Sequence, residues 1–126
     1  MSIKLPKGFK AAGVYAGIKL DKTRNDVSLI ISDQPCTAAG VYTKNLVFAA
    51  PVALDRARTP GEGIRAVVIN SGNANACTGE RGDRDAAQMA ALGASACGAK
   101  SDEALVLSTG VIGEFLPMEK IEAGII

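Results

Sequence analysis

A short run of β-branched residues, residues 64–70 (IRAVVIN), constrains the fold more than any other stretch of the sequence. Its brevity and its Val and Ile content predict a strand that is buried near the centre of a sheet. A loop of small residues, a helical stretch and an apolar run over residues 104–107 follow it. This strand–loop–helix–strand unit, preceded by a strand-rich half, predicts an α/β or α+β fold with a mixed sheet packed by helices.

The amino-terminal half reads as strands joined by turns. Alternation over residues 11–20 predicts a strand, and a charged turn leads into a second, more buried strand over residues 27–32, so the two form an antiparallel hairpin. Pro35 is expected to break this second strand, because proline lacks an N–H group. A third strand over residues 38–43, an extended apolar segment within residues 44–55 and an exposed loop over residues 56–63 are predicted to follow.

Two helices are predicted in the carboxyl-terminal half. Residues 83–98 place small residues and Met89 along one face, with Asp83 as the N-terminal cap, which favours close approach of this helix to the sheet. Pro117 suits the first turn of a second helix, whose apolar stripe runs to the last residue, Ile126. Such a stripe indicates that the helix docks on another polypeptide or that the chain is part of a longer one.

Composition excludes several classes of function. The 126 residues are predicted to form a single domain, and the net charge of +1 gives no field that would attract nucleic acid or an anionic membrane. The sequence has no histidine, which removes the commonest general base, and no apolar stretch long enough for a signal peptide or a membrane span. The three cysteines have no CxxC spacing, which fits a reducing cytoplasm. Each of them is predicted to be a buried structural thiol.

The best chemical candidate is Thr109-Gly110, at the end of the apolar run over residues 104–107. A hydroxyl beside a bare backbone N–H can stabilise an oxyanion, although local spacing alone fits an ordinary strand-to-helix turn at least as well. Residues 71–79, rich in Asn and Gly, form either a pocket-shaping loop or a tight, internally hydrogen-bonded crossover. Cys77 is a weak candidate for a nucleophile because the sequence has no histidine to activate its thiol. The first turn of the helix, with Asp83 and Asp85, is assigned no catalytic role.

Several sequence blocks together resemble the amino-terminal region of the bifunctional ornithine acetyltransferases. The blocks occur in the order of the family and span nearly the whole chain. They are GFKAAGV at residues 8–14, TAAGVYTKN at 37–45, AAPV at 49–52, VINSGNANACTG at 68–79, STGVIG at 108–113 and LPM at 116–118.

The resemblance implies an arginine-biosynthesis enzyme with a layered α/β sandwich and an arrangement like that of enzymes with an amino-terminal nucleophile. Such an enzyme moves an acetyl group from N-acetylornithine to glutamate through an acetyl-threonine, in some members also using acetyl-CoA as co-substrate. It needs no metal or bound cofactor. The threonine starts a β-chain made by self-cleavage, its own amine serves as base, and the chains assemble as α2β2. In this family, the residues matching Thr109 and Gly110 form the oxyanion hole.

This sequence departs from the pattern because it contains no self-cleavage motif, and the family's nucleophilic threonine lies beyond the region that matches Ile126. We therefore expect an amino-terminal α-chain portion, inactive alone, that carries the oxyanion donors but not the nucleophile. The alternative is a non-catalytic ligand-binding or interaction domain of the same fold. An amidohydrolase-like aminopeptidase is a further alternative, which the blocks disfavour.

Overall fold

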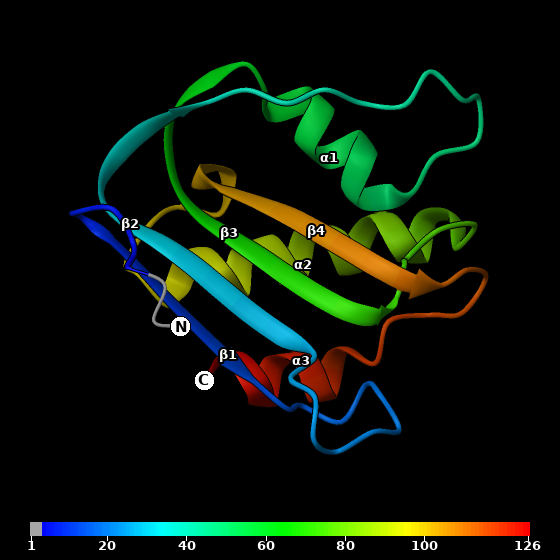
Figure 1. Ribbon diagram of the computed structural model, residues 1–126. Helices are drawn as coiled ribbons and strands as arrows, with labels where there is room; N and C mark the ends of the chain where they lie inside the picture. Colours follow the sequence, from blue (N-terminus) through cyan, green and yellow to red (C-terminus); the bar gives the residue numbers. More distant parts are fainter. Residues whose placement is uncertain (1–3) are drawn as a thin grey trace.

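A computed structural model describes residues 4–126 and shows a four-stranded mixed sheet (Figure 1). The strands are β1 (Phe9–Val14), β2 (Val27–Ala38), β3 (Gly61–Asn73) and β4 (Ala104–Val111), in the spatial order β1-β2-β3-β4. β1 and β2 pair antiparallel, as do β2 and β3, whereas β3 and β4 pair parallel. The predicted mixed sheet is therefore confirmed; the first three residues of the predicted domain lie outside the described part.

Helices cover one face and one edge of this sheet. In Figure 1, α2 (Gly79–Ser95) and α3 (Met118–Ile125) lie behind the sheet, and α1 (Ala50–Arg58) lies along the β4 edge. A short 3-10 helix, Ser101–Glu103, precedes β4. The core lies between the sheet and α2, where Val68, Met89 and Val106 are almost fully buried. Across residues 4–126, no helix is long and apolar enough to span a membrane.

The unit β3-α2-β4 confirms the prediction made from residues 64–107. Alternate residues of β3, among them Ala66 and Val68, are buried against α2. The face of α2 that packs on them consists mainly of small residues, as predicted, and this allows the helix to approach the sheet closely. A Cβ atom added at Gly93 would lie 1.8 Å from Cγ2 of Val68, so only glycine fits this crossing point. The helix begins at Gly79 rather than at Asp83, because Thr78 and not Asp83 takes the N-cap position.

The predicted hairpin is also confirmed, but β1 ends at Val14 and residues 15–20 leave the sheet. Asp26, 3% exposed, explains this departure. Its carboxylate accepts hydrogen bonds from the backbone N–H groups of Ala16, Ile18 and Lys19 at 2.6–2.9 Å. Burial acts to raise the pKa of Asp26, but the backbone N–H donors outweigh it and hold this pKa below its usual value.

Between residues 33 and 63 the prediction was wrong in three places. Pro35 does not end β2, which continues to Ala38, because the register with β3 shifts between Ile31 and Cys36 and so tolerates a missing N–H. Residues 39–49 form no strand. Residues 50–58 form α1 instead of an extended segment and a loop, because Pro51 occupies the first turn, where its missing N–H costs nothing.

Replacement of Gly93 by alanine tests the close packing of α2 on β3. We expect Gly93→Ala to lower the free energy of unfolding by about 1–3 kcal/mol, because overpacking against Val68 exceeds the gain in helix propensity. Urea unfolding measures this. Gln88→Ala, on the exposed face of the same helix, should change stability by less than about 0.5 kcal/mol. A Gly93→Ala protein as stable as the native chain would show that α2 does not pack this closely.

Candidate functional site

A cavity of about 400 Å³ lies between α1, residues 41–43 and the carboxyl-terminal ends of β3 and β4. Most of its lining is apolar, and six polar residues contribute to it: Tyr42, Thr43, Asp55, Asn70, Ser108 and Thr109. They come from four different segments, so the folded sheet brings them together. An apolar cavity with a few convergent polar groups is the usual form of a small-molecule site.

Thr109 and Gly110 lie where the sequence places them, at the end of β4, and both are exposed. Thr109 lines the cavity, and its hydroxyl makes no hydrogen bond to another residue within 4–126. Gly110 has φ of +136°, a conformation that side-chain-bearing residues rarely adopt. A Cβ atom here would lie 2.3 Å from the carbonyl carbon of Gly72, so the backbones of β3 and β4 come together at these two glycines.

Asp55 of α1 is 4% exposed and joins the helix to the edge of the sheet. Its Oδ1 atom accepts a hydrogen bond from the Val106 N–H at 2.9 Å, which satisfies an edge N–H of β4. Burial raises the pKa of the Asp55 carboxyl above its usual value, while the Val106 hydrogen bond and the positive charge of Arg58 oppose this rise. Asp55 is thus a buried acid whose ionisation is disfavoured at the wall of the cavity.

Asn70 and Ser108 face each other in register on β3 and β4. Asn70 is fully buried, and its Nδ2 atom donates to the carbonyl oxygen of Asn73 at 2.9 Å. Neither Asn70 Oδ1 nor Ser108 Oγ has a hydrogen-bond partner among residues 4–126. Because buried polar atoms are normally paired, these two oxygens can accept N–H or O–H donors at the cavity wall.

The Asn-rich loop is internally hydrogen-bonded, as one of the two predicted alternatives requires. Asn75, fully buried with φ of +48°, donates from Nδ2 to the Gly82 carbonyl at 2.9 Å, and its Oδ1 accepts from Thr78 at 2.7 Å. Close by, Cys77, Thr78 and Gly79 line a second hollow of about 300 Å³ beside α1. The loop therefore fixes its own shape and also forms part of a concave surface.

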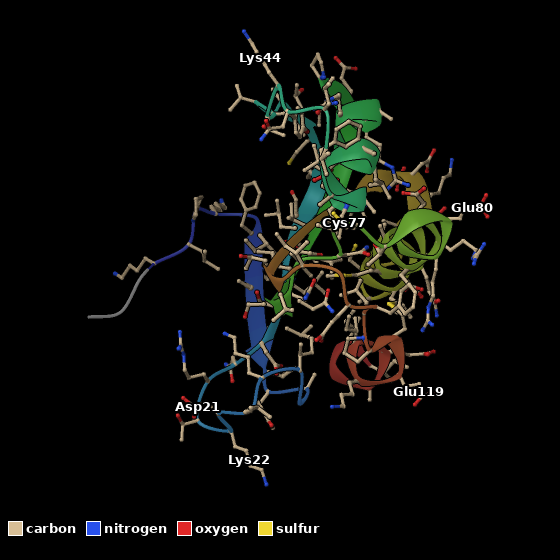
Figure 2. The ribbon with its side chains drawn as sticks, turned by 90° about the vertical axis from the view of Figure 1, so that its right-hand side faces the viewer. Asp21, Lys22, Lys44, Cys77, Glu80 and Glu119 are labelled. Carbon is tan, nitrogen blue, oxygen red and sulfur yellow. The ribbon has the colours of Figure 1, made fainter. Side chains whose placement is uncertain are left out.

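The prediction of three buried structural thiols was wrong for Cys77, which is exposed, whereas Cys36 and Cys97 are partly buried. Figure 2 shows Cys77 below α1, where the chain passes from β3 to α2, and its backbone there has φ of +57°. The helix start is only partly solvated, since Asp85 is 8% exposed and lies 3.8 Å from Arg81. No group of three or more metal-ligating side chains occurs within residues 4–126.

Sequence reasoning missed Asp55 and Asn70 as members of the site. Asp55 fell in a segment that was predicted to be extended, although Pro51 at a helical first turn was a usable signal. Asn70 could have been found as the polar residue that follows Ile64, Ala66 and Val68 on the apolar face of its strand.

Comparisons with known proteins agree with the fold and with the resemblance. Residues 10–126 match the ArgJ family. The arginine biosynthesis bifunctional protein ArgJ of Symbiobacterium thermophilum is 56% identical over 124 residues, which cover 98% of this chain and 31% of that protein. Its counterpart from Rhodopirellula baltica is 54% identical, over 96% of this chain and 29% of that protein. The chain thus spans about a third of the length of these curated relatives.

Two solved structures share the fold. The crystal structure of ornithine acetyltransferase from Mycobacterium tuberculosis, complexed with ornithine, superimposes with a TM-score of 0.89 at 44% identity, over 95% of this chain and 65% of that chain. The structure of arginine biosynthesis bifunctional protein argJ from Bacillus halodurans gives a TM-score of 0.87 at 45% identity, over 94% of this chain and 62% of that one.

The raised pKa of Asp55 predicts a specific pH dependence of stability. Asp55→Asn keeps an oxygen for the Val106 N–H and removes the charge. Because the folded pKa lies above the unfolded value of 3.8, the native chain loses stability as pH rises through the folded pKa, and the variant does not. Urea unfolding between about pH 3 and about pH 7 should show that the free energy of unfolding of the variant rises relative to that of the native chain as the pH increases. A constant difference would contradict the burial of this charge.

Proposed function

The chain belongs to the ArgJ family, and on that premise we propose that it is the amino-terminal part of an acetyltransferase of arginine biosynthesis. The enzyme moves an acetyl group from N-acetylornithine to glutamate through an acetyl-threonine. This chain supplies the oxyanion hole, formed by the Thr109 hydroxyl and the Gly110 N–H. The observation that carries the proposal is the position of this pair, exposed at the end of β4 beside the cavity.

In the first step, the hydroxyl oxygen of a threonine on a second chain attacks the acetyl carbon of N-acetylornithine. The C–N bond breaks, the proton of the hydroxyl passes to the departing amine, and an acetyl ester remains on the threonine. In the second step, the amine of glutamate attacks that ester and releases the threonine hydroxyl. Each step passes through a tetrahedral oxyanion, and two fixed donors at its oxygen lower both barriers.

The geometry of the chain suits the role of donor rather than nucleophile. Thr109 has no neighbouring base, since the sequence lacks histidine and the nearest carboxyl in the cavity, that of Asp55, is bound to Val106. An unactivated threonine hydroxyl attacks poorly but donates a hydrogen bond well. The nucleophile and its base therefore come from the β-chain, whose amino-terminal threonine carries both.

The same proposal extends to partners and compartment. The α- and β-chains assemble as α2β2 in the cytoplasm, and the reaction requires no metal or bound cofactor, because the acyl group passes directly between threonine and amine. Acetyl-CoA serves as a second acetyl donor if the enzyme is bifunctional, as the names of the relatives state for those proteins. The ornithine bound to the Mycobacterium tuberculosis enzyme supports an amino-acid substrate.

Replacement of Thr109 tests the proposed role. We use a chimera in which this chain replaces the matching 124-residue segment of the Symbiobacterium thermophilum relative. Thr109→Ala should lower the turnover of acetyl transfer from N-acetylornithine to glutamate by roughly 10²–10³-fold, because one oxyanion donor is lost. Thr109→Ser, which keeps the hydroxyl, should retain most of the turnover.

Thr37→Ala, at an exposed threonine of β2, is the matched control and should leave turnover unchanged. Unchanged turnover in Thr109→Ala would overturn the oxyanion role. An inactive unaltered chimera, next to an active relative, would favour the alternative, a non-catalytic ligand-binding or interaction domain of the same fold.

A further inference from the structure

The side chain of Asn73, at the end of β3, binds the segment that follows Thr109 and Gly110. Its Nδ2 group donates one hydrogen bond to the Glu114 carbonyl at 3.1 Å and another to the Phe115 carbonyl at 3.0 Å. Its Oδ1 atom accepts from the Asn75 N–H at 2.8 Å. Asn73 is 4% exposed, so these bonds lie away from competing water. Both ends of the carboxamide are thereby fixed in one orientation.

Two backbone hydrogen bonds reinforce this connection. The Ala74 N–H donates to the Val111 carbonyl at 2.8 Å, and the Gly113 N–H donates to the Ala76 carbonyl at 2.9 Å. Residues 111–115 are therefore held against residues 73–76 along their whole length. The chain leaving β4 is positioned by the Asn-rich loop rather than by the sheet alone.

Gly110 lies between this bonded segment and the regular part of β4. The register is irregular here, since Asn73 pairs with both Thr109 and Val111. A Cβ atom at Gly110 would also lie 2.5 Å from the Asn73 backbone nitrogen. The direction of the Gly110 N–H thus depends on where residues 111–115 are held. Donors to an oxyanion act only when they are placed to within a few tenths of an ångström.

We propose that Asn73 is a positioning residue for acetyl transfer: its carboxamide, through Glu114 and Phe115, sets the placement of Thr109 and Gly110 as oxyanion donors. This inference rests on the proposed function of that pair. Asn73 itself touches no reacting atom. It acts by fixing the strand end that carries the donors.

Asn73→Asp is the informative substitution because it preserves size and the acceptor for Asn75 while removing both N–H donors. It also sets a carboxylate oxygen against two carbonyl oxygens, which must move apart. In the chimera, we expect kcat to fall by roughly 10–100-fold, as for displacement of a catalytic group by up to about 1 Å, with KM for both substrates changed by less than about 3-fold.

Combination with Thr109→Ala separates positioning from general loss of stability. If Asn73 acts through the donor pair, part of its effect disappears with the Thr109 hydroxyl, so the loss of kcat in the double variant should be clearly smaller than the product of the two single losses. Asn25→Asp is the matched control: it too removes an amide N–H that donates to a backbone carbonyl, that of Gly13 at 3.0 Å, but in the turn before β2, which lies two strands from β4. Its kcat should be unchanged.

An Asn73→Asp chimera with normal kcat, or one whose loss multiplies fully with that of Thr109→Ala, would overturn the positioning role while leaving the proposed function intact. A Thr109→Ala chimera with normal turnover would instead overturn the function on which the inference rests. If Asn73→Asp does not fold, Asn73→Ser, which keeps one hydroxyl donor, takes its place, and we expect a smaller fall in kcat. A normal kcat, or a loss that multiplies fully with that of Thr109→Ala, would again overturn the positioning role.

Discussion

The close contact of β3 and β4 at Gly72 and Gly110 is the constraint on which the site depends. Here the two backbones approach so closely that no side chain fits at Gly110, which adopts φ of +136°. The parallel pairing that makes this contact requires a crossover, and α2 supplies it. The tight crossing of α2 at Gly93 and the glycine contact at the strand ends are therefore parts of one arrangement.

Burial of amides at the ends of these strands gives the site its rigidity. Asn70, Asn73 and Asn75 are all at most 4% exposed, and each makes at least one side-chain hydrogen bond to the backbone. Because a buried amide without partners destabilises a fold, each of these bonds offsets part of the cost of burying its amide. The result is a fixed platform beside an open cavity, which suits electrostatic stabilisation of a transition state better than a mobile loop would.

The parts of the fold that sequence alone predicted are those with strong local periodicity. β3, the body of α2 and the start of β4 follow from alternating or helical apolar patterns. Two of the errors arose where contacts from outside the segment decide its conformation. Pro35 is tolerated because the register with β3 shifts beside it, and Asp26 draws residues 15–20 out of the sheet by binding their N–H groups. Neither contact leaves a local signature. Likewise, the sequence places Thr109 at a strand end, but only the fold brings Asp55 to the same cavity.

A crystal structure of the chimera, trapped with the amino-terminal threonine of its β-chain acetylated, would test whether this chain holds two donors ready for an oxyanion. We expect the acetyl carbonyl oxygen to lie about 2.7–3.1 Å from both Thr109 Oγ1 and the Gly110 nitrogen, with the φ of the glycine still positive. An acetyl oxygen that points elsewhere, with neither atom within hydrogen-bond distance, would contradict it.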